Sequence, residues 1–277
     1  IEFRTSANYG HDIKGVSYER ETHATPTAAD SYSLNAMPGK TDTKSFTIDY
    51  SNVRLLLSLD KDDNTAFSVS PTTVGDCGMP GVETITITYA PKQGGSETNT
   101  LYIKKHTGEE VKSIALSGTA SKIAQKITGN NVQSSYNTTD KATLTAEADS
   151  KLTEFVYTAS PEGVAEFNGN VMTFKKSCYN LSITITQPGN TSYEPCSTTV
   201  SNIKVNKVTP TITTLPTAGD ITYGAASNTS VLSGGAAKDD KENVVDGSFA
   251  WEESETKPTG GTHAYAVRFK PTKTDWY

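Results

Sequence analysis

The sequence predicts an all-β protein composed of tandem β-sandwiches, and three observations support this prediction. Thr and Ser contribute 42 and 27 of the 277 residues, and β-branched Thr suits the solvent-facing side of a pleated strand. Residues with high helix propensity never form a run with the 3.6-residue period of an amphipathic helix. Polar and apolar residues instead alternate strictly in several short runs, a period of two that is typical of antiparallel strands with one buried face.

The alternating runs locate the clearest strands, which are residues 45–50, 84–89, 113–117, 182–186 and 264–269. Turn-forming pairs lie between these runs, among them Pro80-Gly81, Gly94-Gly95, Pro188-Gly189 and Gly234-Gly235. Short strands with a turn about every 8–12 residues indicate sandwiches of small sheets.

Two short polar linkers divide the chain into three predicted domains. The first linker, residues 117–121, closes one strand before a new start at Lys122. The second, residues 205–212, contains Pro210, which cannot donate a hydrogen bond to a central strand ladder. The predicted domains are therefore residues 1–121, 122–207 and 208–277. Residues 1–30 form a leader that is either an opening strand pair or the remnant of an earlier domain.

Sequence motifs in all three parts resemble known immunoglobulin-like families. Residues 31–120 resemble the ASPM/SPD-2/Hydin-like domains through the motifs FSVSP at 67–71, ITITYAP at 85–91 and IALSGTA at 114–120. Residues 122–207 resemble a second bacterial immunoglobulin-like type through VAEFNGN at 164–170 and ITITQPGNTSY at 183–193. Residues 208–277 resemble MBG-type repeats through ITYG at 221–224, GSFAW at 247–251 and FKPT at 269–272.

The resemblance implies tandem immunoglobulin-like β-sandwiches from a large, exported bacterial cell-surface protein. Such domains act as non-catalytic spacers that present another module away from the membrane, so the implied location is extracytoplasmic and the implied partners are other domains of the same longer chain. The alternative is an adhesin-like binding module for polysaccharide or host glycoprotein. In the MBG pattern a final strand follows the position of Tyr277, so we expect the third domain to lack its last strand.

Composition and spacing exclude several other classes of protein. The net charge of −6 and the absence of Lys/Arg clusters argue against nucleic-acid binding. No window approaches the roughly 18 unbroken apolar residues that a membrane-spanning helix needs. The four His and three Cys are too scattered for a zinc site, and no nucleophile motif is present. We therefore expect no enzymatic activity, no catalytic residue, no metal and no cofactor.

Three acidic clusters are candidates for chemistry, and each fits a solvated segment better. Residues 60–64 begin like a calcium loop, but Thr65 and Pro71 stand where an EF-hand needs Gly and Glu. Residues 239–242 mix charges of both signs, as an exposed loop does. Glu252, Glu253 and Glu255 lie on one short segment, whereas a glycosidase needs two carboxyl groups that face each other across a cleft.

The cysteines and the tryptophans complete the set of candidate residues. Cys178 and Cys196 flank a strand, residues 181–187, that separates its ends by roughly 23 Å at ~3.3 Å per residue, so a disulfide would need the following loop to fold back. Cys77 would remain unpaired in either case. Trp251 is expected in the core, with a sugar-stacking surface as its alternative. Trp276 and Tyr277 are the speculative ligand-binding residues.

Overall fold

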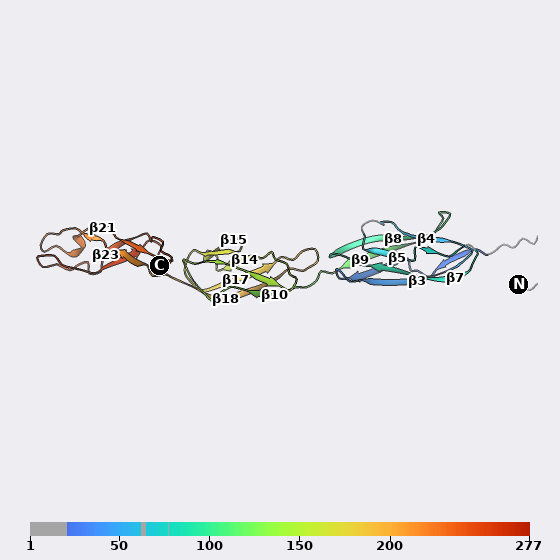
Figure 1. Cartoon of the computed structure of the whole chain (residues 1–277), viewed down its shortest axis with the longest axis horizontal. Coiled ribbons are helices and arrows are strands. Elements are labelled where there is room, and N and C mark those ends of the chain that lie inside the picture. The colour runs from blue at the N-terminus through green and yellow to red at the C-terminus, as the bar shows by residue number, and fades with distance from the viewer. Residues whose placement is uncertain (1–20, 62–64, 77) are drawn as a thin grey trace, which may run out of the picture. The chain divides into compact units, whose positions relative to one another are not determined.

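The computed structural model describes residues 21–61, 65–76 and 78–277, and the chain forms two compact units, Ile1–Ile123 and Ala124–Tyr277 (Figure 1). Its described elements are strands apart from one short 3-10 helix, η1 (Ser227–Thr229). The predicted all-β fold class is confirmed. The question about the leader falls partly on residues 1–20, which lie outside the described residues, as do residues 62–64 of the first acidic cluster and Cys77.

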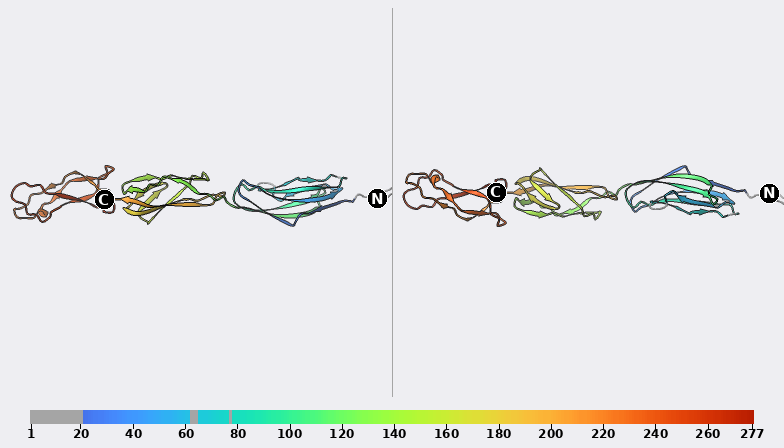
Figure 2. Two further views of the ribbon diagram at one scale, coloured as in Figure 1. Left: turned by 90° about the horizontal axis from the view of Figure 1, so that it is seen from below. Right: turned by 90° about the horizontal axis from the view of Figure 1, so that it is seen from above.

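The first unit is a sandwich of two sheets, whose layers are visible in Figure 2. Its described strands are β1 (His23–Pro26), β2 (Ser31–Ala36), β3 (Asp42–Ser51), β4 (Leu55–Leu59), β5 (Phe67–Ser70), β6 (Thr73–Val74), β7 (Gly81–Tyr89), β8 (Gly95–Lys105) and β9 (Glu110–Ala120). One sheet has the order β1-β3-β7-β5 and the other β2-β9-β8-β4-β6. The first order is that of strands A, B, E and D in an immunoglobulin-type sandwich, and β4, β8 and β9 take the places of C, F and G.

Strict alternation along the strands of the first unit produces its core. Phe46 and Ile48 of β3 face the core together with Ile85 and Ile87 of β7, and the intervening residues point outward. The outward hydroxyls pair across strands, as in the contact of 3.1 Å between Ser45 Oγ and Thr86 Oγ1. The high Thr and Ser content therefore belongs to the wet faces of ordered sheets.

The second unit begins with a further sandwich, which we call the middle module. Its strands are β10 (Ile127–Asn130), β11 (Ser135–Asn137), β12 (Lys141–Thr143), β13 (Ala146–Ala148), β14 (Val156–Ser160), β15 (Ala165–Asn168), β16 (Val171–Phe174), β17 (Cys178–Gln187) and β18 (Cys196–Asn206). The order β11-β18-β17-β14 repeats the second sheet type of the first unit, and β10-β13 with β12-β16-β15 repeats the first. Its core is a separate cluster in which the rings of Tyr136 and Phe174 lie 5.2 Å apart.

The β17–β18 hairpin keeps the two cysteines of this module apart. Cys178 lies opposite Val205, and Cys196 lies opposite Gln187, so the thiols sit at opposite ends of the ladder. Both are free. As expected from the sequence, the strand between Cys178 and Cys196 keeps the two thiols apart.

The remaining strands form the third module, which consists of two-stranded antiparallel ladders. Its strands are β19 (Thr211–Thr214), β20 (Thr217–Ala218), β21 (Leu232–Ser233), β22 (Ala236–Lys238), β23 (Gly247–Trp251) and β24 (Val267–Pro271). They pair as β19-β22, β20-β21 and β23-β24, and no ladder of the described residues joins them to the middle module. The division at 207/208 and the missing last strand stay predictions.

Candidate functional site

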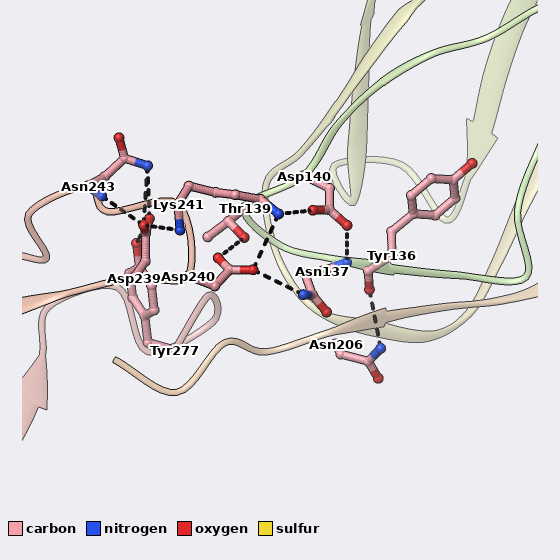
Figure 3. A network of polar contacts seen from close by, with 10 residues as sticks. All are labelled: Tyr136, Asn137, Thr139, Asp140, Asn206, Asp239, Asp240, Lys241, Asn243 and Tyr277. Atoms are coloured by element: carbon pink, nitrogen blue, oxygen red, sulfur yellow. Dashed lines mark hydrogen bonds and ion pairs between the residues drawn. The ribbon is translucent and has the colours of Figure 1, made fainter. Parts of the chain in front are cut away.

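The most elaborate polar site of the second unit lies where the middle and third modules meet, and we call it the joint. It comprises residues 137–140, 175–177 and 206–208 on one side and residues 239–243 and 272–277 on the other. Figure 3 shows the polar network at its centre. The end of the chain belongs to the joint, because Lys207 Nζ contacts the Tyr277 carbonyl oxygen at 3.4 Å.

Asp239 organises the loop that the third module contributes to the joint. Its carboxylate accepts hydrogen bonds of 2.9 Å from the backbone N–H groups of Lys241 and Asn243, and a further bond of 3.1 Å from Asn243 Nδ2. An aspartate that binds the backbone of the residues just after it fixes a tight turn. Only 7% of Asp239 is exposed, so the expectation of a fully exposed loop at 239–242 is wrong for this residue.

The turn directs two charged side chains at the middle module. Asp240 accepts hydrogen bonds from Thr139 Oγ1 at 2.6 Å and from Asn137 Nδ2 at 3.2 Å. Lys241 Nζ lies 3.0 Å from Asp140 Oδ1 and 3.5 Å from Asp240 Oδ2. Charged groups of both modules thus alternate in sign across the joint, as Figure 3 shows.

The network shifts the ionisation of its members. The hydrogen bond from Thr139, then that from Asn137 and the charge of Lys241, lower the pKa of the Asp240 carboxyl despite the opposing effect of burial. Burial also opposes ionisation of Asp239, but the bonds from Asn243, Lys241 and Tyr277 together leave its pKa lowered. Asp140, and then Asp240, raise the pKa of Lys241. All three groups are therefore held in their charged forms.

Trp276 and Tyr277, the residues predicted as a speculative ligand platform, lie in the joint. The Trp276 carbonyl oxygen accepts bonds from Thr138 Oγ1 at 2.8 Å and from the Val208 N–H at 3.0 Å. Its indole Nε1 donates to the Lys175 carbonyl at 2.5 Å. The Tyr277 hydroxyl lies 3.4 Å from Asp239 Oδ2, and burial, followed by the charge of Asp239, raises the pKa of its phenol. Their role towards a ligand stays a prediction, whereas their contacts within the chain hold the two modules together.

The other acidic candidates are not brought together. Glu252 pairs with Arg268, Glu253 accepts a bond from Thr256, and Glu255 accepts one from Asn228. Among the residues that the structure describes, no group of three or more His, Cys, Asp or Glu side chains could hold a metal ion. Within the same residues no helix is long and apolar enough to cross a membrane.

The middle-module half of the joint was not predicted from the sequence. Thr139 lies 101 positions before its partner Asp240, and Thr138 lies 138 positions before Trp276. Single polar residues in a turn carry no mark of such distant partners. The residues of the joint that the sequence singles out, the acidic cluster at 239–242 together with Trp276 and Tyr277, all belong to the third module.

No protein-family model matches the chain, and no curated protein matches it. Among solved structures, the chain is similar to an ASH/PapD-like domain of human CEP192, with 18% identity over 42% of this chain and 98% of that one, at a TM-score of 0.32. It is also similar to the titin domains Z1Z2, solved in complex with telethonin, with 14% identity over 68% and 98% and a TM-score of 0.33. A third similar structure is the D00-D0 domain of intimin, with 10% identity over 66% of this chain and 100% of that one, at a TM-score of 0.27.

These likenesses are distant, and the strand orders of the two sandwiches define the class. The chain is an all-β protein of tandem immunoglobulin-like modules.

Proposed function

We propose that the chain is a non-catalytic structural region of an exported bacterial cell-surface repeat protein, which holds another module of the same longer chain away from the membrane. The observation that carries this proposal is the joint between the middle and third modules. A spacer needs junctions that resist bending, and here both sides of the linker are bonded to the neighbouring module.

The linker between the middle and third modules is short, and its residues form hydrogen bonds. Only residues 207–210 lie between β18 and β19, and Lys207 and Val208 both bond to residues 274–277 at the end of the chain. A linker with few free residues permits little rotation of the modules that it connects. Ordinary inter-domain contacts in a chain allow relative motion by default, so these added bonds favour a mechanical role.

The location and the family are part of the proposal, and what supports them is the resemblance of the sequence motifs. The motifs at 67–71, 164–170 and 221–224 resemble bacterial immunoglobulin-like and MBG-type repeats of exported proteins. We therefore expect other domains of a longer surface protein as the partners of this chain.

A replacement experiment in producer cells tests the spacer function. Residues 122–277 of the full-length protein are exchanged for an unrelated immunoglobulin-like pair of equal length, and antibody labelling of intact cells measures display. We expect labelling and exposure of the neighbouring module to be retained, and to fall when residues 122–277 are deleted. If the exchanged protein is displayed at the normal level but the neighbouring module is no longer exposed to antibody, the spacer proposal is wrong.

A further inference from the structure

We infer that the third module carries a binding cleft for a neutral saccharide, formed between the loop at 218–225 and the loop at 258–265. The cleft has a volume of about 460 Å³. Ligand sites in proteins occupy roughly 300–1,000 Å³ and combine aromatic walls with a few polar groups. The cleft shares no residue with the joint, so the inference goes beyond the spacer function and does not depend on it.

The topology of the third module places this cleft away from the joint. In the β23–β24 ladder, Gly247 pairs with Pro271 and Trp251 pairs with Val267. The chain leaves Pro271 towards the joint, whereas the connection from Trp251 to Val267 forms one wall of the cleft at the other end of the ladder. A ligand at this end would not encounter the middle module.

Three aromatic side chains line the cleft. Trp251 is half-buried, its Nε1 donates to the Ser230 carbonyl at 3.0 Å, and its ring meets Tyr265 edge-on at 6.4 Å. Trp251 therefore forms an ordered wall of the cleft. Its burial lies between that of the predicted core residue and that of the alternative, an exposed sugar-stacking residue. Tyr223 is 84% exposed although it lines the cleft. Sugar rings have apolar C–H faces that pack on such rings, which offer a large contact area with few rotatable bonds.

The polar groups of the cleft fit a neutral ligand that carries many hydroxyls. No Lys or Arg is among the described residues that line it, and the imidazole Nε2 of its one histidine, His263, bonds to Thr259, so the cleft offers no permanent positive charge to a phosphate, sulfate or carboxylate. The carboxylate of Asp220 and the hydroxyls of Tyr223 and Tyr265 make no hydrogen bond with other described residues, and all three can bond to sugar hydroxyls. A proline-rich peptide would use the rings and its carbonyl groups could accept bonds from the tyrosine hydroxyls, but its prolines have no N–H to donate to the Asp220 carboxylate, so the saccharide is favoured.

A glycan array followed by calorimetry tests this inference on the full chain. The array holds neutral oligosaccharides together with their sialylated and sulfated counterparts, and a proline-rich peptide is included as a probe. We expect retention of at least one neutral oligosaccharide, with weaker retention of its acidic counterparts. Titration with that oligosaccharide is then repeated on Tyr223→Ala, on Asp220→Asn and on the control Tyr179→Ala.

The variants are chosen so that folding does not confuse the result. Tyr223 and Tyr179 are both more than four-fifths exposed, at 84% and 88%, but Tyr179 lies on β17 of the middle module. We expect affinity to fall about tenfold or more for Tyr223→Ala, severalfold for Asp220→Asn, and not at all for Tyr179→Ala. Absence of any neutral hit, preference for acidic glycans, selective binding of the peptide, or equal affinity of the two tyrosine variants would each overturn the inference.

Discussion

The buried carboxylate of Asp239 shows how one residue shapes the joint. It accepts bonds from two backbone N–H groups and two side chains, all within the third module. Removal of such an acceptor leaves buried donors unsatisfied, which costs more than the net value of the bonds themselves. The turn that directs Asp240 and Lys241 at the middle module therefore depends on Asp239.

We predict that Asp239→Ala lowers the free energy of unfolding of the third module by about 2–3 kcal/mol, as expected for loss of a buried charged acceptor. Urea denaturation followed by tryptophan fluorescence measures this selectively, because the two tryptophans of the chain, Trp251 and Trp276, both belong to the third module. Asp220→Asn, a change at an exposed aspartate outside the joint, serves as the control. An unchanged midpoint for Asp239→Ala would contradict this role.

The charged residues of the joint also predict a pH dependence. Asp239 and Asp240 have lowered pKa values, so their contribution is complete above the ordinary carboxyl pKa of about 3.9 and is lost as the pH falls through the lowered values. Lys241 and Tyr277 have raised pKa values, so their contribution to stability is complete below about pH 10 and is lost as the pH rises further.

We therefore expect these four groups to leave the urea midpoint of unfolding, followed by tryptophan fluorescence, nearly constant between about pH 4 and pH 10. The midpoint should fall below about pH 4 and above about pH 10. The acid limb should flatten in the double variant Asp239→Asn/Asp240→Asn. An acid limb that is identical in the wild-type chain and in this variant would show that other groups cause it.

At the same scale, sequence reasoning could reach only local contacts. The bonds from Asp239 to Lys241 and Asn243 span two and four positions, and an aspartate before such a turn is a recognisable pattern. The bond to Asp239 from the Tyr277 hydroxyl spans 38 positions, and no local pattern indicates such a partner, so the sequence alone favours an exposed loop.

Among the elements, β7 and β9 of the first unit approach each other closely, and this contact can be tested by mutation. Gly118 of β9 lies against the buried ring of Tyr89, and a Cβ at this glycine would come within 2.3 Å of the ring. The ring belongs to the core and packs in a tilted arrangement against the ring of Phe67, with 4.9 Å between the ring centroids.

We predict that Gly118→Ala destabilises the first unit by about 1–3 kcal/mol, the usual cost of overpacking a core. Calorimetry of the full chain should show a lowered transition for this unit alone. The matched control is Gly129→Ala on β10, where a Cβ would meet nothing within 4 Å. Equal transitions in the two variants would mean that the Tyr89–Gly118 contact is not close in solution.

Strict alternation predicted the long strands well, because each has one face in a core. The segment 182–186 lies within β17, and 84–89 lies within β7. The predicted strand at 264–269 begins later, at Val267, because the β23–β24 ladder ends at the Trp251–Val267 pair and Tyr265 lines the cleft instead. Alternation alone does not show where a partner strand stops.

For the whole molecule, the two proposals assign different parts of the third module to different tasks. One end bonds to the middle module through residues 239–243 and 272–277, and the cleft lies beyond the other end of the β23–β24 ladder. The sequence indicated sandwich modules and their approximate limits. It could not indicate the joint, because the joint consists of pairs of polar residues that only the folded chain brings together.

Residual dipolar couplings of the full chain test the central claim, which is that the joint fixes the third module to the middle module. We predict that amide couplings from both modules fit a single alignment tensor at pH 7. In the variant Asp240→Ala/Lys241→Ala, which removes the bonds to Thr139, Asn137 and Asp140, the two modules should require separate tensors. Separate tensors of different magnitude in the wild-type chain would contradict the account.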